Sequence, residues 1–230
     1  MPIFKSNHPL IKHKMTALRD RKTSNKDFRQ LLREVTFFLG YEATSNITTE
    51  SKEVVTPMGV TNVGDKVNDN VCIIPILRAG LGMADGMSEL LPNASIHHIG
   101  MYREKQSLLP IQYYNKLPKD KNCDIAYVVD PCIATSNTIS AVVSIIKRWG
   151  AKKIVVISCI GAKSGVDQLV EKHPDVDVYI GAIDDVLSPE GMIIPGLGDA
   201  GDRQFGTPSD EVPELPSPTS GGSPSKRAKR

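Results

Sequence analysis

The chain has 230 residues, of which 40% are hydrophobic and 23% charged; these are the proportions of a globular protein with a sizeable core. Its 28 basic and 26 acidic residues give a formal net charge of +2, which excludes a strong single-sign field that would draw the whole surface to nucleic acid or anionic lipid. No apolar run approaches the roughly 18 residues of a membrane span, and the start of the chain lacks the apolar core of a signal peptide. We therefore expect a cytoplasmic protein without membrane or nucleic-acid partners.

The four cysteines are not spaced as metal ligands or redox pairs, because no C-x-x-C motif joins Cys72, Cys123, Cys132 and Cys159. Three of them lie within or beside strongly apolar segments. We expect free, buried thiols in a reducing compartment.

The first predicted element is an amphipathic helix from Ser24 to Gly40, in which apolar residues recur at intervals of three and four. Ser24 or Asn25 is available as its N-cap, and Gly40 as its stop. The stretch 47–69 that follows is polar and rich in turn residues. We expect no more than short strands there, with Thr56-Pro57-Met58-Gly59 as a hairpin connection.

Apolar segments then alternate with helical patterns along the chain. Strands are predicted at 71–76, 96–101, 125–129, 154–160 and 176–180, and helices at 81–91, 138–149 and 164–172. Continuous apolar strands separated by helices are typical of an α/β fold, in which a parallel sheet is covered by helices on both faces. In such a fold the ligand lies at the carboxyl ends of the strands.

The segment 102–118 interrupts this alternation. Tyr102, Tyr113 and Tyr114 flank polar residues and Pro110, a pattern that indicates an excursion from the sheet. We expect a β-arm that serves as a lid over the site.

The end of the chain differs in composition from the rest. Residues 208–230 are rich in Pro, Ser and Gly, so we expect a disordered tail, while residues 1–207 are predicted to form one domain. The tail closes on Lys-Arg-Ala-Lys-Arg. Two interpretations of this basic cluster stay open: a patch for nuclear import or polyanion binding, and a solvated chain end.

Asp130 follows the buried strand 125–129 and begins a turn of small and hydroxyl-bearing residues that leads into the next helix. A helix N-terminus with free N–H groups and nearby hydroxyls favours an anion such as phosphate, and an acid at the strand's end can accept hydrogen bonds from a sugar diol. A simple capping turn is the competing interpretation. The candidate binding residues are Asp130, Pro131, Cys132, Ile133, Ala134, Thr135, Ser136, Asn137 and Thr138.

Two arginines lie just after predicted strands. Arg78 comes after strand 71–76, beside glycines that let a ligand approach the backbone, and Arg103 follows the next strand. Because neighbouring parallel strands end at one edge of a sheet, the two guanidinium groups are candidates for binding one polyphosphate. The alternative for each arginine is a surface ion pair.

The segment 191–203 is rich in glycine and proline. Residues 196–201 match G-x-G-x-x-G, but no long helix and second strand follow, so we reject a dinucleotide site. The irregular backbone has N–H and C=O groups that need partners. A flat heterocycle with donors and acceptors would satisfy them.

Together these stretches resemble the uracil phosphoribosyltransferase family, from His8 to Thr207. Most specific are HPLIKHK at the start, PILRAGLGM at 75–83, VVDP at 128–131 and IIPGLGDAGDR at 193–203. The resemblance implies a phosphoribosyltransferase-type fold and an enzyme of pyrimidine salvage. Such an enzyme transfers the 5-phosphoribosyl group from phosphoribosyl pyrophosphate to N1 of uracil, giving UMP and pyrophosphate.

The resemblance also implies roles for the residues that bind the phosphoribosyl donor. Asp130 would hold the ribose hydroxyls, and Thr135 to Thr138 the 5′-phosphate. Arg78 and Arg103, which with Asp130 are the catalytic candidates, would bind pyrophosphate. Mg²⁺ would enter on the pyrophosphate, with its waters near Asp199 and no direct protein ligand.

For the acceptor, the resemblance implies that backbone at Ile193 and Gly198 binds uracil, and Ala200 is a further substrate-binding candidate. It also implies GTP as an activator and a homodimer or homotetramer as the assembly.

Two positions depart from the family's usual pattern. Ser136, Asn137 and Thr138 stand where the family has two glycines and a serine, and a left-handed backbone costs a residue with a Cβ about 1–2 kcal/mol. Met192 stands in place of a tyrosine beside the presumed uracil pocket. Two functions therefore stay open: an active transferase, and a catalytically weak relative that binds pyrimidine nucleotide as a sensor or partner subunit.

Overall fold

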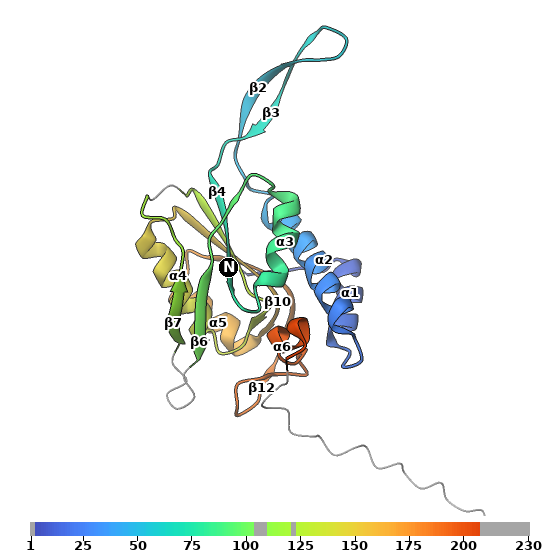
Figure 1. Cartoon of the computed structure of the whole chain (residues 1–230), viewed down its shortest axis with the longest axis vertical. Coiled ribbons are helices and arrows are strands. Elements are labelled where there is room, and N and C mark those ends of the chain that lie inside the picture. Colours follow the sequence, from blue (N-terminus) through green and yellow to red (C-terminus); the bar gives the residue numbers. More distant parts are fainter. Residues whose placement is uncertain (1–2, 104–109, 121–122, 208–230) are drawn as a thin grey trace, which may run out of the picture.

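The computed structural model of the chain describes residues 3–103, 110–120 and 123–207. At its centre lies a largely parallel sheet in the order β1-β11-β10-β8-β4-β6-β7, in which only the pair β6–β7 is antiparallel. Helices cover both faces of this sheet (Figure 1). The predicted α/β class and parallel sheet are therefore confirmed. No helix within the described residues is long and apolar enough to cross a membrane.

The sheet is built from strands that the sequence placed to within a few residues, apart from short additions. Its strands are β1 (Ile3–Lys5), β4 (Val71–Leu77), β5 (Ser95–Ile96), β6 (Ile99–Arg103), β7 (Pro110–Asn115), β8 (Ile125–Val129), β9 (Cys132–Ile133), β10 (Lys153–Ala162) and β11 (Asp177–Asp184). The single strand predicted at 96–101 was wrong: it divides into β5 and β6, both of which pair with β4.

Two helical layers sandwich the sheet, and alternate residues of each central strand face one layer or the other. On one face lie α1 (Pro9–Arg19), α2 (Asn25–Ala43) and α3 (Leu81–Leu90), packed on Ile73, Tyr127 and Val129. On the other lie α4 (Asn137–Trp149) and α5 (Lys163–Lys172), packed on Ile74 and Val128. Burial on both faces explains why these strands are continuously apolar.

Helix α2 begins where the sequence predicted, since the Ser24 hydroxyl accepts a hydrogen bond from the Asp27 N–H at 3.1 Å. The predicted stop at Gly40 was wrong, because the helix continues to Ala43. Gly40 is instead a contact point between helices: a Cβ there would overlap the Met87 sulfur and Leu90 of α3. A small residue was mistaken for a helix terminator.

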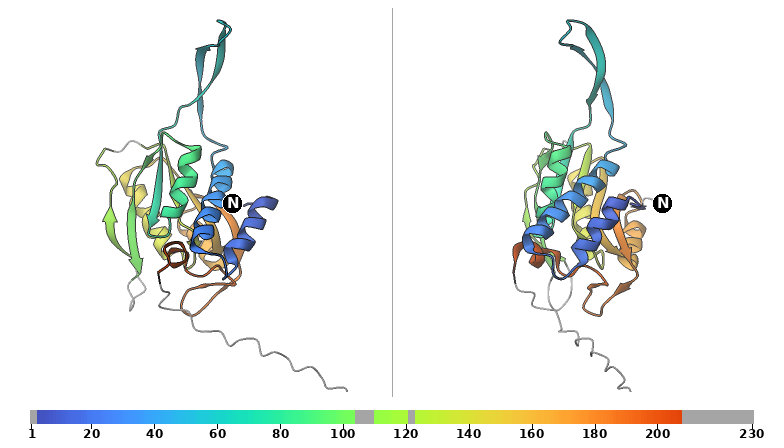
Figure 2. Two further views of the ribbon diagram at one scale, coloured as in Figure 1. Left: turned by 45° about the vertical axis from the view of Figure 1, so that its right-hand side comes forward. Right: turned by 90° about the vertical axis from the view of Figure 1, so that its right-hand side faces the viewer.

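A long hairpin, β2 (Thr49–Val55) and β3 (Thr61–Val67), projects from the body of the molecule (Figures 1 and 2). The predicted connection is confirmed: the Thr56 N–H donates to the Val60 carbonyl at 3.0 Å, and Gly59 has φ +74°. The strands are longer than expected, with seven residues each. Every residue of β2 and all but one of β3 are exposed, so the hairpin contributes nothing to the core.

The segment that interrupts the alternation does form a β-arm within the described residues. Strand β6 runs on to Arg103, and β7 returns antiparallel to it with an irregular register between Gly100 and Met101. The rings of Tyr102 and Tyr113 lie 6.2 Å apart. The tip, 104–109, and the tail, 208–230, lie outside the described residues, so the disorder predicted for the tail stays a prediction.

Four elements were not predicted: α1, β12 (Val186–Leu187), β13 (Ile193–Ile194) and α6 (Ala200–Phe205). Helix α1 is capped by His8, whose Nδ1 accepts from the Leu10 N–H at 3.2 Å, and histidine is an uncommon cap.

All four cysteines are free, as predicted; Cys132 is partly exposed and the other three are buried.

Candidate active site

A cavity of about 560 Å³ opens at the carboxyl ends of the central strands, as the fold class predicts. Its walls come from three parts of the chain: the loop 130–138 with the start of α4, the residue Ala79 after β4, and the segment 190–201. The lining residues are Ala79, Asp130, Cys132, Ile133, Ala134, Thr135, Ser136, Thr138, Ile139, Glu190, Gly191, Met192, Ile193, Leu197, Gly198, Asp199, Ala200 and Gly201.

The loop 130–138 is shaped by Ser136, which caps α4 with φ 61° and ψ −8°. Within the described residues it is the one residue other than glycine with a positive φ. The helix starts at Asn137, and the Ser140 N–H donates to the Ser136 carbonyl at 2.9 Å. The first N–H groups of a helix have no partner within the helix, so the start of α4, which borders the cavity, can bind an anion there.

Helix α5 packs against the same loop. The Ser136 hydroxyl, which is buried, donates to Gln168 Oε1 of α5 at 2.8 Å. Gly165, also in α5, packs so closely that a Cβ there would overlap the carbonyl oxygen of Ala134. The serine hydroxyl therefore bonds to a neighbouring helix, rather than being free to donate to a ligand.

Asp130 faces the cavity in a setting that disfavours its charge. Burial raises its pKa to about 8, and the negative charge of Asp199 adds to the effect. Burial likewise raises the pKa of the neighbouring Cys132 thiol well above its ordinary value. The carboxyl group of Asp130 therefore keeps its proton to a higher pH than an ordinary aspartate, and in the protonated form it can donate a hydrogen bond as well as accept one.

The opposite wall is the loop 193–199, which begins with the short strand β13 and continues as irregular backbone. The Ile194–Pro195 peptide bond is cis, and Gly196 and Gly198 have φ +60° and +78°. Asp199 ends the loop and caps α6, because its carboxylate accepts from the Asp202 N–H at 2.8 Å. Asp199 is exposed and lines the cavity together with Asp130.

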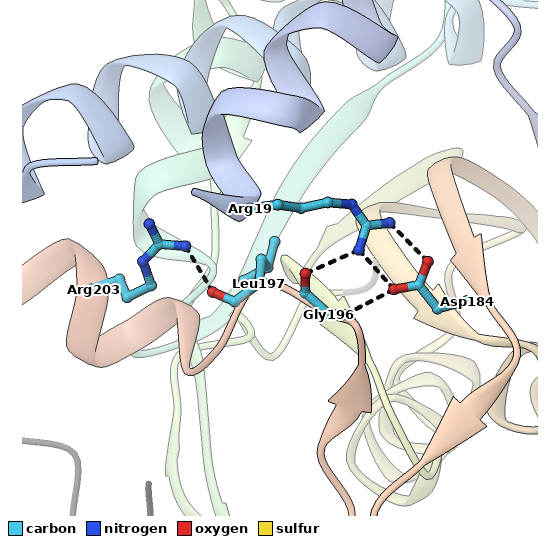
Figure 3. Close-up of polar contacts among 5 residues, drawn as sticks. All are labelled: Arg19, Asp184, Gly196, Leu197 and Arg203. Atoms are coloured by element: carbon cyan, nitrogen blue, oxygen red, sulfur yellow. Dashed lines mark hydrogen bonds and ion pairs between the residues drawn. The ribbon is translucent and has the colours of Figure 1, made fainter. Parts of the chain in front are cut away.

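Two arginines hold the loop 193–199 from outside the cavity (Figure 3). Arg19, at the end of α1, donates to both carboxylate oxygens of Asp184 at 2.7 Å and to the Gly196 carbonyl at 2.9 Å. Arg203, in α6, donates to the Leu197 carbonyl at 2.7 Å and to backbone oxygens of Leu18 and Asp20. The sequence analysis singled out neither residue for a role in the site.

Arg78 follows β4 directly, as the sequence predicted. It is absent from the cavity lining and sits at the rim, paired with Asp202 at 3.1 Å and 3.5 Å from the Thr207 hydroxyl. Its guanidinium lies 5.8 Å from the centre of the Phe205 ring. The ion pair that was kept open as the alternative is therefore present, and the binding of pyrophosphate by Arg78 stays a prediction. The side chain of Arg103 lies outside what the structure describes, so the convergence of the two arginines stays a prediction.

Most of the other candidates do meet on one cavity. Asp130, Cys132, Ile133, Ala134, Thr135, Ser136, Thr138, Ile193, Gly198, Asp199 and Ala200 line it, whereas Pro131 and Asn137 do not. Pro131 is buried, and its carbonyl accepts from the N–H groups of Cys159 and Ile160 in β10. The lining residues not named as candidates include Ala79, Gly191 and Leu197, all inside segments noted in the sequence, and Glu190, for which the sequence carried no signal.

Metal ligands are not gathered at this site. Among residues 3–103, 110–120 and 123–207, no group of three or more His, Cys, Asp or Glu side chains is placed to hold a metal ion. Three residues with carboxyl groups line the cavity: Asp130, Glu190 and Asp199.

The fold defines the class. The adenine phosphoribosyl transferase from Trypanosoma brucei, solved with AMP, pyrophosphate and ribose-5-phosphate, matches this fold with a TM-score of 0.52 at 15% sequence identity, covering 83% of this chain and 87% of that one. The structure of the AQ2163 protein from Aquifex aeolicus matches with a TM-score of 0.84 at 36% identity, over 88% of this chain and 97% of that one. The chain has the phosphoribosyltransferase fold.

The family follows from sequence comparison. The uracil phosphoribosyltransferase family model matches residues 5–207. The uracil phosphoribosyltransferase of Dictyoglomus thermophilum is 49% identical over 87% of this chain and 97% of its own length, and that of Roseiflexus sp. is 46% identical over 88% and 97%. The chain belongs to the uracil phosphoribosyltransferase family and is a transferase of pyrimidine salvage. The resemblance seen in the motifs is confirmed.

Proposed function

We propose that the cavity catalyses the transfer of the 5-phosphoribosyl group from phosphoribosyl pyrophosphate to N1 of uracil, giving UMP and pyrophosphate. One observation carries this proposal: Asp130, the start of α4 and the loop 193–199 all border one cavity of about 560 Å³. A sugar-binding acid, a phosphate site and a backbone surface for a planar base are thus within reach of one substrate pair.

The donor is held by the loop 130–138. The N–H groups at the start of α4 and the hydroxyls of Thr135 and Thr138 bind the 5′-phosphate. Asp130 binds the ribose hydroxyls, and its raised pKa lets it enter this contact as a donor or an acceptor. The Ser136 hydroxyl is committed to Gln168, so at this position backbone rather than side chain meets the phosphate.

The acceptor is held by the loop 193–199. Uracil is planar, with alternating donors and acceptors, and the backbone at Ile193 and Gly198 supplies the complementary groups. Met192, which also lines the cavity, packs an adaptable apolar side chain beside the base.

The transfer itself needs electrostatic help rather than a nucleophilic side chain. Breaking the anomeric bond develops positive charge on the ribose and negative charge on pyrophosphate, which cations must stabilise. We assign this role to Arg78 and Arg103. Arg78 is half exposed, with 53% of its side chain accessible, so it can exchange its Asp202 partner for pyrophosphate. Mg²⁺ supplies further positive charge when pyrophosphate brings it in, and Asp199 fits a contact through its waters.

UMP formation by the purified protein, given uracil, phosphoribosyl pyrophosphate and Mg²⁺, tests the proposal, with Asp130→Asn as the control. We expect product from the wild type and at least a 100-fold lower rate from the variant. A folded wild-type protein that binds UMP without forming it would instead support the sensor or partner-subunit function, which no relative favours.

Assembly, control and location are further proposals from the family resemblance. We propose a homodimer or homotetramer, and the projecting hairpin β2–β3 supports this because it exposes Val54, Val55, Met58 and Val63 on a part of the chain that packs on nothing else. We also propose activation by GTP and residence in the cytoplasm, with nuclear entry through the Lys-Arg-Ala-Lys-Arg tail. Rate measurements with and without GTP test the first of these.

A further inference from the structure

We propose that Arg19 and Asp184 are positioning residues for the pyrimidine: together they fix the backbone at Gly196 and so set the affinity for the acceptor, without taking part in binding the donor. This inference rests on the proposed function of the loop 193–199 as the base site. Neither residue lines the cavity, so any effect on the base must pass through the loop.

The two side chains and one glycine form a closed hydrogen-bonded ring (Figure 3). Arg19 Nη2 donates to Asp184 Oδ1 at 2.7 Å, and Nη1 donates both to Asp184 Oδ2 at 2.7 Å and to the Gly196 carbonyl at 2.9 Å. The Gly196 N–H donates to the same Oδ2 at 2.9 Å. Both polar backbone groups of Gly196 are therefore bound by a single ion pair.

The position that is fixed is a demanding one. Gly196 has φ +60° and leaves no room for a Cβ against the Ile193 carbonyl. Ile193, which comes before Gly196 in the loop, and Gly198, which comes after it, line the cavity. Beyond β13 the loop has no regular hydrogen-bonding pattern, so it needs outside partners to keep one conformation. A base that is bound by backbone groups needs that conformation in advance.

The ion pair is also too buried to serve as a surface contact. The side chain of Asp184 is 8% exposed and that of Arg19 26%, and Arg19 together with the Gly196 N–H lowers the pKa of Asp184. Only a planar guanidinium can bind both carboxylate oxygens and a carbonyl at once, so lysine is not an equivalent. The pair joins the end of α1 to the end of β11, across 165 positions of sequence.

Arg203 strengthens the same connection from the other side. It joins the Leu197 carbonyl to the carbonyls of Leu18 and Asp20, which flank Arg19, and its guanidinium lies 4.4 Å from the centre of the Phe28 ring. The last turn of α1 is thus the common support for Gly196 and Leu197. Arg203 contacts Leu197, a cavity residue, so the cleaner test uses Arg19 and Asp184.

Steady-state kinetics of Arg19→Lys and Asp184→Asn provide the test. The lysine cannot reproduce the fork, and the asparagine must turn an N–H₂ donor toward a donor of Arg19 or Gly196. We expect the KM for uracil to rise at least 10-fold and the KM for phosphoribosyl pyrophosphate to stay within 2-fold. Lys147→Gln is the control, because it breaks an ion pair with Asp175 that is remote from the cavity lining; both of its KM values should match the wild type.

Folded variants with an unchanged KM for uracil, or with an equal rise in both KM values, would overturn the inference, whereas a wild type that forms no UMP would instead overturn the proposed function. Should the variants fold poorly, hydrogen exchange of the wild-type protein decides. We expect the Gly196 amide to exchange at least 100-fold more slowly than an unprotected amide; an unprotected Gly196 would show that the ring does not hold in solution.

Discussion

Ser136 occupies a left-handed conformation that costs a residue with a Cβ about 1–2 kcal/mol, and its hydroxyl bonds to Gln168 at 2.8 Å. A part-buried hydrogen bond contributes about 0.5–1.5 kcal/mol. The two terms are of similar size and opposite sign. The bond to Gln168 therefore offsets much of the strain that comes with having serine at this turn, and it ties the turn to α5.

A double-mutant cycle tests this account. Gln168→Ala should lower the free energy of unfolding by about 1 kcal/mol and raise the KM for phosphoribosyl pyrophosphate, because the strained turn loses its support. In a Ser136→Gly background the same change should have little effect, since the glycine carries neither the strain nor the hydroxyl. Equal effects of Gln168→Ala in both backgrounds, measured by denaturant unfolding and kinetics, would contradict it.

Asp130 makes a prediction about pH. Its pKa is about 8 in the folded protein and near 3.8 when unfolded, so the unfolded chain releases this proton first. Its contribution to stability is complete below about pH 4, declines as pH rises, and is lost above about pH 8. Asp130→Asn removes this dependence. We expect its melting temperature to gain on the wild type by at least about 3 °C between pH 5 and pH 9, corresponding to roughly 1 kcal/mol; a difference independent of pH would contradict the assignment.

Helix α5 shapes the phosphate loop at the scale of whole elements. Gly165 lets the helix approach the Ala134 carbonyl, where a Cβ would overlap it. Gly165→Ala should push the loop into the cavity and raise the KM for phosphoribosyl pyrophosphate at least 10-fold, while leaving the KM for uracil within about 3-fold. Gly64→Ala on the hairpin, where the nearest atom is 3.8 Å from a Cβ, is the matched control. A KM for the donor that stays at the wild-type value would show that the loop is set by other contacts.

The arm β6–β7 is proposed as a lid, because water competes with uracil for the activated sugar and must be excluded. The arm extends from the carboxyl end of β6, and the cavity opens at the carboxyl ends of the central strands. The side chains of Tyr102 and Tyr113 are exposed in the free protein. We expect the backbone amides of β6 and β7 to exchange more slowly with solvent when both substrates are bound. Unchanged exchange, alongside slower exchange at the start of α4 as a sign of binding, would exclude the lid.

Sequence reasoning performed well where one physical rule acts alone. Long apolar strands and the periodic helices were placed to within a few residues, and an acid followed by a hydroxyl-rich turn was enough to locate Asp130 and Ser136. It failed where the role of a residue depends on partners that are far away in the sequence. Gly40 was predicted as a stop because its neighbours in α3 cannot be read from the sequence. The ion pair between Arg78 and Asp202, which lies 124 positions away, could not be read from it either.

The same limit explains the missed support of the base site. Arg19 and Asp184 are ordinary charged residues in sequence, separated by 165 positions. Only the fold places the end of α1 beside the end of β11. The motif at 193–203 did identify the loop that they hold, because its glycines and proline mark an irregular backbone without reference to any partner.

At the scale of the whole molecule, the hairpin β2–β3 is the one described part that stands apart from the body (Figure 2). Val55 and Val63 are 74% and 62% exposed there. Replacing both with lysine should lower the molecular mass measured by light scattering to that of a smaller assembly, because the apolar contact with a second copy would be lost. Lys52→Ala on the same strand should keep the wild-type mass. An unchanged mass for the double variant would place the interface elsewhere.

The ring of Arg19, Asp184 and Gly196 also bears on the order in which the molecule is built. Contacts between segments far apart in sequence carry a large loop-closure cost and form late. The donor-binding loop needs only β8, α4 and their neighbours β10 and α5, all complete by residue 172. The base site needs the first helix, β11 and α6 together. The part of the site that binds the sugar phosphate can therefore fold while the rest of the chain is still being synthesised. The part that binds the base forms last.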